Sequence, residues 1–252
     1  MTNIKKTLLY YWYVHPTGWN EIYNFHIKNL KIYKDVFDNE IFIISRDDDT
    51  KQEYIDNVKN HIIEIFPNVE FREYKNDKEL RESFWFYNEI ALKLKDLPDA
   101  WYFFAHNKGV DTWYTSKELC YKWIAGMYFM NLHNVDGVES HMSLEDTCVI
   151  GTYLIRNVKA WSFLKYNWHF SGTYWWFNPH RVYDVMIKNN NSIPINNRYF
   201  TEGFFGSVIP DEERYRRPAL MRYDANWRYG FAWMNKEMQK TFAVKYQSLN
   251  SL

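Results

Sequence analysis

Over the first 110 residues, short runs of bulky apolar residues alternate with longer segments of helical periodicity. The short runs have the length of buried strands, and the longer segments repeat apolar residues every three or four positions. Strands and helices that alternate at this spacing predict βαβ units and a mainly parallel sheet. The predicted strands cover residues 7–14, 40–45, 69–74 and 101–105, and the predicted helices cover residues 22–34, 51–66 and 77–94.

The second half of the chain has a less regular pattern. It contains no internal repeat and no low-complexity linker, so residues 1–252 are interpreted as a single α/β domain with helices flanking a mixed, mainly parallel sheet. Periodicity and turn residues predict a helix over 115–132, a loop over 136–146, a strand over 147–154, a helix over 157–164, a strand-like aromatic run over 168–178 and a helix over 179–188.

Polar side chains follow the predicted strands where each strand ends. The strand at 101–105 is followed by His106, Asn107 and Lys108. In open α/β sheets, ligands bind outside the carboxyl ends of the strands, so an imidazole and an ammonium at this place indicate an anionic ligand. An ordinary polar turn remains the alternative. The loop at His15 and the acidic run at 47–49 should reach the same edge.

The composition narrows the class of ligand. Aromatic residues make up 20% of the chain, with 12 Trp, 21 Tyr and 18 Phe, and aromatic rings stack on sugars and bases as well as filling cores. Lys plus Arg equals Asp plus Glu, at 31 each, so no net field attracts nucleic acid or an acidic membrane surface. Carbohydrate or nucleotide ligands are therefore favoured over nucleic acid.

Neither the cysteines nor the apolar runs indicate secretion or membrane insertion. Cys120 and Cys148 match no zinc or redox spacing and are interpreted as buried structural residues in a reducing compartment. No apolar run approaches the roughly 18 residues that a transmembrane helix needs. The sequence therefore predicts a soluble, cytoplasmic protein without a transmembrane segment.

Two later segments also carry candidate site residues. The aromatic run at 168–178 is interrupted by Gly172, and glycine within a strand often marks a bulge or a close approach by a ligand. The segment at 199–206 places one carboxylate, that of Glu202, among aromatic residues and glycines.

The order of these features resembles the nucleotide-sugar glycosyltransferases of the GT-A fold. The resemblance is to small bacterial and viral polysaccharide-type members with H-x-K-G and H-x-S-G-x-x-W-W motifs, which stand here at residues 106–109 and 169–176. It extends from the first strand to about Gly206 and rests on two short motifs in the expected order and spacing. It implies a GT-A fold, transfer of a hexose or deoxyhexose from a nucleoside diphosphate sugar to a glycan or lipid-linked acceptor, and a role in polysaccharide biosynthesis.

The resemblance implies a nucleotide-binding half over residues 1–110 and an acceptor half with a C-terminal tail over residues 111–252. Family members usually hold Mn²⁺ or Mg²⁺ on a D-x-D at the end of the central strand. Here that strand ends in His106, Asn107 and Lys108, so the metal is left unknown and Lys108 is expected to neutralise the diphosphate with His106 and Arg222. The nucleotide-contacting candidates also include Asp47, Asp48 and Asp49, for which a solvated turn and metal ligation remain alternatives.

The same resemblance implies roles on the acceptor side. By position, Glu202 resembles the general base of inverting members. In a retaining enzyme it would instead orient the donor sugar. A purely structural role, as a helix cap or in an ion pair, is the third alternative. His169 would bind a sugar hydroxyl or satisfy a backbone carbonyl. One tryptophan of the pair would stack on the sugar while the other fills the core, because neighbours on a strand point to opposite faces. The full set of acceptor-side candidates is His169, Ser171, Gly172, Trp175 and Trp176.

Two other functions remain open on the sequence. One is a non-catalytic glycan-binding module that uses an aromatic surface alone. The other is a nuclease or phosphotransfer enzyme with a metal bound by residues 47–49 and His106, which the balanced charge argues against.

Overall fold

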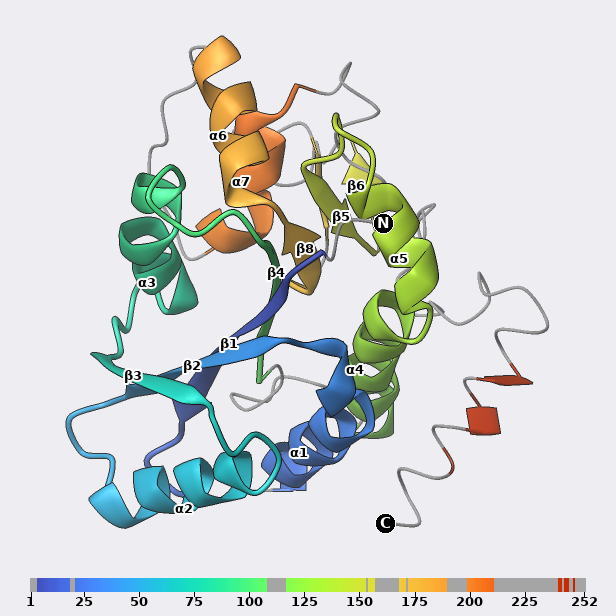
Figure 1. The fold of residues 1–252 in the computed structure, drawn as a ribbon. Coiled ribbons are helices and arrows are strands. Elements are labelled where there is room, and N and C mark those ends of the chain that lie inside the picture. Colours follow the sequence, from blue (N-terminus) through green and yellow to red (C-terminus); the bar gives the residue numbers. More distant parts are fainter. Residues whose placement is uncertain are drawn as a thin grey trace.

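Six strands form the main sheet, in the order β3-β2-β1-β4-β8-β5 (Figure 1). The computed structural model describes residues 4–18, 21–107, 117–152, 154–156, 168–170, 172–189 and 199–210, with residues 240, 241, 243, 244 and 247. In the main sheet, β3, β2, β1 and β4 are parallel, and β8 is antiparallel to both β4 and β5. The strands are β1 Lys6–Val14, β2 Asn39–Arg46, β3 Glu70–Lys75, β4 Trp101–His106, β5 Val149–Gly151 and β8 Trp175–Phe177. The mixed α/β fold with a mostly parallel sheet is confirmed.

A second, two-stranded sheet pairs β6 (Leu154–Arg156) with β7 (Trp168–Phe170) in antiparallel register. The helices are α1 Glu21–Tyr33, α2 Gln52–Ile63, α3 Glu82–Glu89, α4 Lys117–Leu132, α5 Val135–Met142, α6 Pro179–Lys188 and α7 Phe200–Val208, with short 3₁₀ helices at η1 Lys34–Val36 and η2 Ala91–Lys93.

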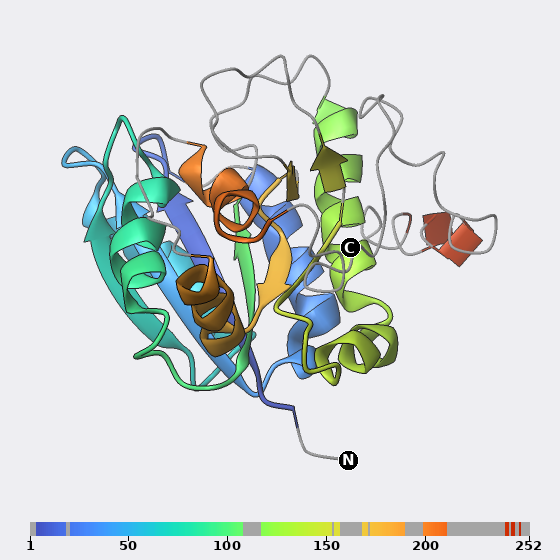
Figure 2. The same cartoon turned by 90° about the horizontal axis from the view of Figure 1, so that it is seen from above.

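Helices cover both faces of the main sheet (Figures 1 and 2). Buried residues of α1, α2, α4 and α5 form one hydrophobic cluster with one face of the sheet. Residues of α3, α6, α7 and the small sheet form a second cluster with the opposite face. The neighbours Tyr10 and Tyr11 on β1 illustrate the division, because Tyr10 belongs to the first cluster and Tyr11 to the second.

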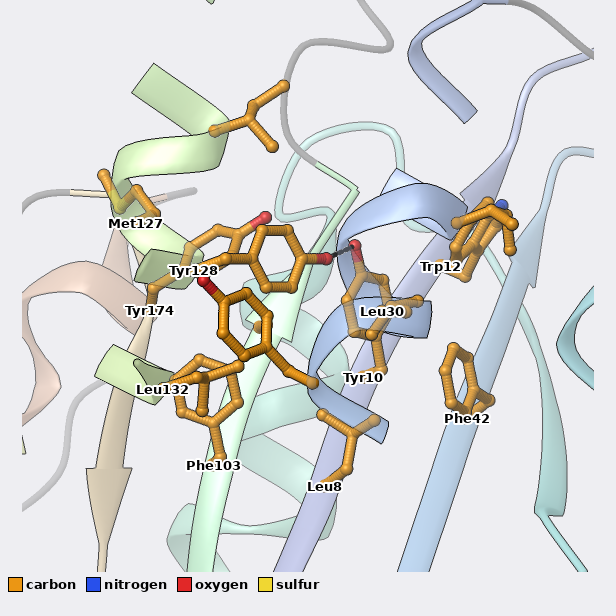
Figure 3. Packing of buried hydrophobic residues seen from close by; sticks show 14 of the residues in the cluster. Leu8, Tyr10, Trp12, Leu30, Phe42, Phe103, Met127, Tyr128, Leu132 and Tyr174 are labelled. Carbon is orange, nitrogen blue, oxygen red and sulfur yellow. Dashed lines mark hydrogen bonds between the residues drawn. The ribbon is translucent and has the colours of Figure 1, made fainter. Parts of the chain in front are cut away.

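Most of the described aromatic residues fill these two clusters. Tyr10, Tyr128 and Tyr174 meet between β1, α4 and the segment before β8 (Figure 3). The Tyr128 hydroxyl donates to the Tyr10 hydroxyl at 2.9 Å, so the buried polar tips have partners. Within the described part of the chain, the fully buried tryptophans are Trp12, Trp85, Trp168, Trp175 and Trp176. Core packing therefore accounts for much of the unusual aromatic content.

The predicted helix over 77–94 is wrong in its extent. The side chain of Asp77 accepts the backbone N–H groups of Glu79 and Leu80 at 2.9 and 2.7 Å, which forms a turn where helix was expected. Arg81 then has φ of +52°, a conformation that no helix interior contains. The helix α3 consequently begins only at Glu82 and is followed by the separate 3₁₀ turn η2.

Two further predictions in the second half need correction. The acidic stretch at 136–146 is not all loop, because α5 forms there with Val138 and Met142 buried four residues apart and with Asn134 as its side-chain cap. The strand predicted over 147–154 is two strands, β5 and β6, which belong to different sheets. The helix predicted over 179–188 is confirmed as α6, whereas the one over 157–164 lies outside the described residues.

The prediction that both cysteines are buried is confirmed. Cys120 and Cys148 are both buried, one in each hydrophobic cluster. Among the described segments, none of the helices has the length and apolar character needed to cross a bilayer.

Candidate functional site

The four parallel strands end at one edge of the sheet, and a polar side chain follows each of them. The register of the strands places Tyr11 of β1 beside His106 of β4, and Tyr13 of β1 beside Ser45 of β2. The loops after β1, β2 and β4 therefore start next to one another, as the sequence pattern predicted.

Asp47, directly after β2, is held by two neighbours. Its Oδ2 accepts the Tyr13 hydroxyl at 2.6 Å, and its Oδ1 accepts the side-chain amide of Asn76 at 2.8 Å. Both donors come from adjacent strands or their exits, so this carboxylate has a defined position. Because a carboxylate has about four lone-pair sites, two remain available to a ligand.

The next two acidic residues differ from Asp47. Asp48 is exposed and pairs with Lys75 at 2.7 Å, and this hydrogen bond lowers the pKa of Asp48. Asp49 is also exposed. Of the three predicted nucleotide contacts, Asp47 is thus the one that the surrounding structure orients.

Asn107 joins the ends of β1 and β4. Its side-chain oxygen accepts the Tyr13 N–H at 2.9 Å, and its side-chain nitrogen donates to the Tyr13 carbonyl at 2.7 Å. The asparagine of the H-x-K-G motif therefore extends the parallel pairing by one residue and determines where the chain leaves the sheet.

His106 connects the two sequence motifs. Its Nε2 lies 3.0 Å from the hydroxyl of Thr173, inside the second motif, and its carbonyl accepts the Tyr174 hydroxyl at 2.6 Å. On the other side of the ring, Nδ1 lies 3.8 Å from the Oε1 of Glu82, in the first turn of α3. The imidazole is thus located between the second motif and a helix of the first half.

The turn that carries Thr173 has an unusual backbone. Gly172 has φ of +94° and Thr173 has φ of +54°. The φ of Gly172 favours glycine whatever the space, and a Cβ there would also displace the terminal methyl of Met127, which would lie 1.9 Å away. Thr173 is β-branched, so its positive φ is a strained conformation. The same residue makes the hydroxyl contact with His106.

Trp175 and Trp176 are both completely buried, on opposite faces of the sheet. Trp176 donates its indole N–H to the Asn131 carbonyl at 3.1 Å, and the ring of Trp175 stacks on Phe104 with centroids 4.9 Å apart. Both therefore pack in the core in this structure, and neither exposes a ring face to a ligand.

Glu202 lies in the first turn of α7 and is partly exposed. It acts electrostatically on His169 of β7: burial lowers the pKa of His169, and the negative charge of Glu202 opposes that shift. The helix also approaches β7 very closely, since a Cβ on Gly206 would lie 1.7 Å from the Trp168 carbonyl oxygen. The two acceptor-side candidates thus belong to one packed unit.

A second contact determines where α7 begins. The Thr201 N–H donates to the Ser83 hydroxyl oxygen at 3.1 Å, so a serine of α3 satisfies one of the free amides at the start of α7. Glu82 precedes Ser83, and Glu202 follows Thr201. The contact therefore brings the first turns of both helices, each with its glutamate, to the same region.

Asp47 and Glu82 both act on the hydroxyl of Tyr11 on β1. Burial raises the pKa of Tyr11, and the charges of Glu82 and Asp47 shift it in the same direction, while the hydrogen bond to Ser45 at 2.7 Å acts against them. The two carboxylates thus both influence one hydroxyl at the strand edge.

Three predicted site residues, Lys108, Ser171 and Arg222, lie outside the described residues. Three other residues were missed by sequence reasoning, namely Glu82, Ser83 and Thr173. Thr173 is inside a quoted motif, so it could have been nominated. Glu82 and Ser83 gave no local signal, because their partners are separated from them in the sequence and meet them only in the fold.

Comparison with known proteins identifies no family for this chain. No family model and no curated protein matches it. Among solved structures, it is similar to 4-diphosphocytidyl-2C-methyl-D-erythritol synthase, with a TM-score of 0.41 and 12% identity over 98% of this chain and 99% of that one. It is also similar to a mannosyltransferase from Pyrobaculum calidifontis in complex with GDP-Man and Mn²⁺, with a TM-score of 0.37 and 10% identity over 97% of this chain and 64% of that one. Neither similarity assigns an activity to this chain.

Proposed function

We propose that this protein is a glycosyltransferase that moves a sugar from a nucleoside diphosphate sugar to a hydroxyl of a glycan or lipid-linked acceptor. The observation that carries the proposal is the contact of His106 with Thr173, because it joins the two motifs of the glycosyltransferase resemblance at the carboxyl edge of a parallel sheet.

The donor nucleoside would bind at the end of β2. Asp47 is held there by Tyr13 and Asn76, so its free lone pairs can accept ribose hydroxyls without reorganisation of the side chain. Asp48 and Asp49, which are more exposed, would contribute mainly charge and shape.

The diphosphate would lie against the exit of β4. Lys108 follows His106 and Asn107 in the chain and would neutralise part of the charge that develops on the leaving group, with Arg222 as a second cation. His106, whose side chain is 11% exposed, would border this site.

Glu202 would be the general base. The acceptor oxygen attacks the anomeric carbon, the bond from that carbon to the diphosphate oxygen breaks, and the hydroxyl proton passes to the Glu202 carboxylate. His169 and the turn at Gly172, with Ser171, would line the acceptor side. The partial exposure of Glu202 and its interaction with His169 support this role.

The described residues do not form a recognisable metal site. Among them, no group of three or more His, Cys, Asp or Glu side chains could together hold a metal ion. Asp48 pairs with Lys75.

A glycan-binding module would need an aromatic surface. Among the described aromatic side chains, only that of Phe84 is well exposed, at 40%. The structure thus gives this alternative no specific support.

Calorimetric titration with UDP-, dTDP- and GDP-sugars, each with and without manganese, tests the proposal. We expect one nucleotide to bind and Asp47→Asn to weaken that binding. The absence of binding to every nucleotide sugar would refute the proposed function.

A further inference from the structure

We propose that Glu82 is a positioning residue that orients the imidazole of His106, together with Thr173 on the other side of the ring. The catalytic consequence of this inference rests on the proposed function, but the orientation of the ring does not. Glu82 belongs to neither sequence motif, and the inference adds a third segment, the start of α3, to the site.

The two ring nitrogens of His106 face two different protein groups. Nδ1 lies 3.8 Å from Glu82 Oε1, and Nε2 lies 3.0 Å from the Thr173 hydroxyl. A carboxylate accepts only, whereas a hydroxyl can donate. In the neutral ring, this arrangement favours the tautomer with the proton on Nδ1, directed at Glu82, and with Nε2 accepting from Thr173.

The distance to Glu82 exceeds a hydrogen bond, and a small movement of the carboxylate closes it. Contacts of this kind are often long in unliganded sites and shorten when the substrate binds. Both side chains are mostly buried, with 11% of His106 and 18% of Glu82 exposed, so solvent screens their interaction only partly.

The backbone around Glu82 is itself held in place. Arg81, just before it, has a positive φ, and Ser83, just after it, contacts both the N–H and the hydroxyl of Thr201. Ser83 thus ties the first turn of α3 to α7, and a residue that orients another needs such support.

The described groups that face the ring come from two segments, α3 and the turn before β8. They are Glu82 from α3, Thr173 from the turn before β8, and Tyr174, whose ring lies edge-on to the imidazole with centroids 6.0 Å apart. Tyr174 is fully buried, and burial raises its pKa, so it stays neutral. Of these three groups, Glu82 is the one with a carboxyl group, and it faces Nδ1.

The first experiment measures the tautomer of His106 by ¹⁵N NMR of the full chain, with the ring signals assigned by their loss in His106→Asn. We expect a protonated Nδ1 in the wild type and in Glu82→Gln, whose amide oxygen can still accept. Glu82→Ala should shift the ring toward the Nε2-protonated form. Glu79→Gln, an exposed change three residues earlier, is the matched control and should leave the spectrum unchanged.

The second experiment measures sugar transfer by the same variants. Glu82→Ala should lower kcat on the order of tenfold to hundredfold, because misplacement of a site group has this effect, and Glu82→Gln should recover most of the loss. In a His106→Asn background, Glu82→Ala should cause no further loss, since a positioning residue acts only through the group it orients.

Either of two results would overturn the role of Glu82: the same His106 tautomer in Glu82→Ala as in the wild type, or losses that multiply in the double variant. A wild-type protein that turns over no nucleotide sugar would defeat the proposed function alone, because the NMR measurement decides the orientation of His106 without a substrate.

Discussion

The side-chain oxygens of Ser83 and Thr201 lie 3.0 Å apart, although 118 residues separate them in the sequence. Ser83 is in the first turn of α3, and Thr201 is in the first turn of α7. Tyr199, the residue before α7, provides no side-chain cap of its own, so Ser83 of the distant helix caps it instead. This contact joins the predicted nucleotide half to the segment that carries Glu202.

Ser83→Ala should destabilise the protein by about 1 to 3 kcal/mol, because it leaves a buried amide of α7 without its acceptor. Urea unfolding measures the change. Ser140→Ala is the control, since the Ser140 hydroxyl makes an exposed hydrogen bond to the Gly137 carbonyl within α5. Equal effects of the two variants would mean that the interhelical cap contributes nothing.

Gly206→Ala should cost about 3 kcal/mol or more, because the added methyl would overlap the backbone carbonyl of Trp168, which has no rotamer to change. Thermal unfolding and the near-ultraviolet circular dichroism of the buried tryptophans report the effect. Ser207→Ala, which removes only a local hydrogen bond to the Phe204 carbonyl, should be much milder. A stable Gly206→Ala variant would show that α7 does not need this close approach to β7.

Asp47→Asn should weaken nucleotide binding on the order of tenfold to hundredfold, the effect of losing a hydrogen bond to a charged group. Asp48→Asn should change it little, because that carboxylate is exposed and pairs with Lys75. Calorimetry with the preferred nucleotide compares the two. If the two variants lose affinity equally, the orientation of Asp47 by Tyr13 and Asn76 has no bearing on binding.

Glu202→Gln should lower kcat by roughly a hundredfold to ten-thousandfold and leave donor affinity nearly unchanged, as expected when a general base is removed. Lys108→Ala should do the reverse and weaken nucleotide binding first. Steady-state kinetics and calorimetry separate these effects. A Glu202→Gln variant that loses donor affinity but keeps its kcat would exclude Glu202 as the base.

His169 should make the protein less stable in mild acid. Because burial lowers its pKa below the unfolded value of about 6.5, the unfolded state binds more protons at pH below 6.5, and the free energy of unfolding falls as the pH falls. The free energy of unfolding stops falling once the pH is also below the pKa of His169 in the folded state, because both states are then protonated. Urea unfolding between pH 7 and pH 5 should show this decline, and His169→Gln should flatten it.

The same pKa links His169 to Glu202. Because the charge of Glu202 opposes the effect of burial, Glu202→Gln should lower the pKa of His169 further, which an NMR titration measures. An unchanged titration would show that the two side chains do not interact in solution.

The order and type of the elements in the first half could be predicted from the residues, because apolar spacing reports directly which positions face a core. The strands at 7–14 and 101–105 were placed to within one residue at each end of β1 and β4. The edge of the sheet that carries Asp47 and His106 followed from the same reasoning, since parallel strands end together.

The exceptions arose where side chains overrode periodicity. The turn made by Asp77 and the positive φ of Arg81 shortened α3, and the short α5 went unnoticed among acidic residues. In both places, a local hydrogen bond from a side chain decided the conformation, and a hydrophobic pattern contains no information about such bonds.

Residue patterns alone were therefore enough for the layers of the fold and for the edge where polar groups gather. The partners within that edge depended on the folded chain: Thr173 and Glu82 on either side of His106, and Ser83 at the start of α7. The reason is physical, because periodicity encodes which face of an element is buried, whereas a hydrogen bond between distant segments depends on distances that exist only after the sheet and helices have packed.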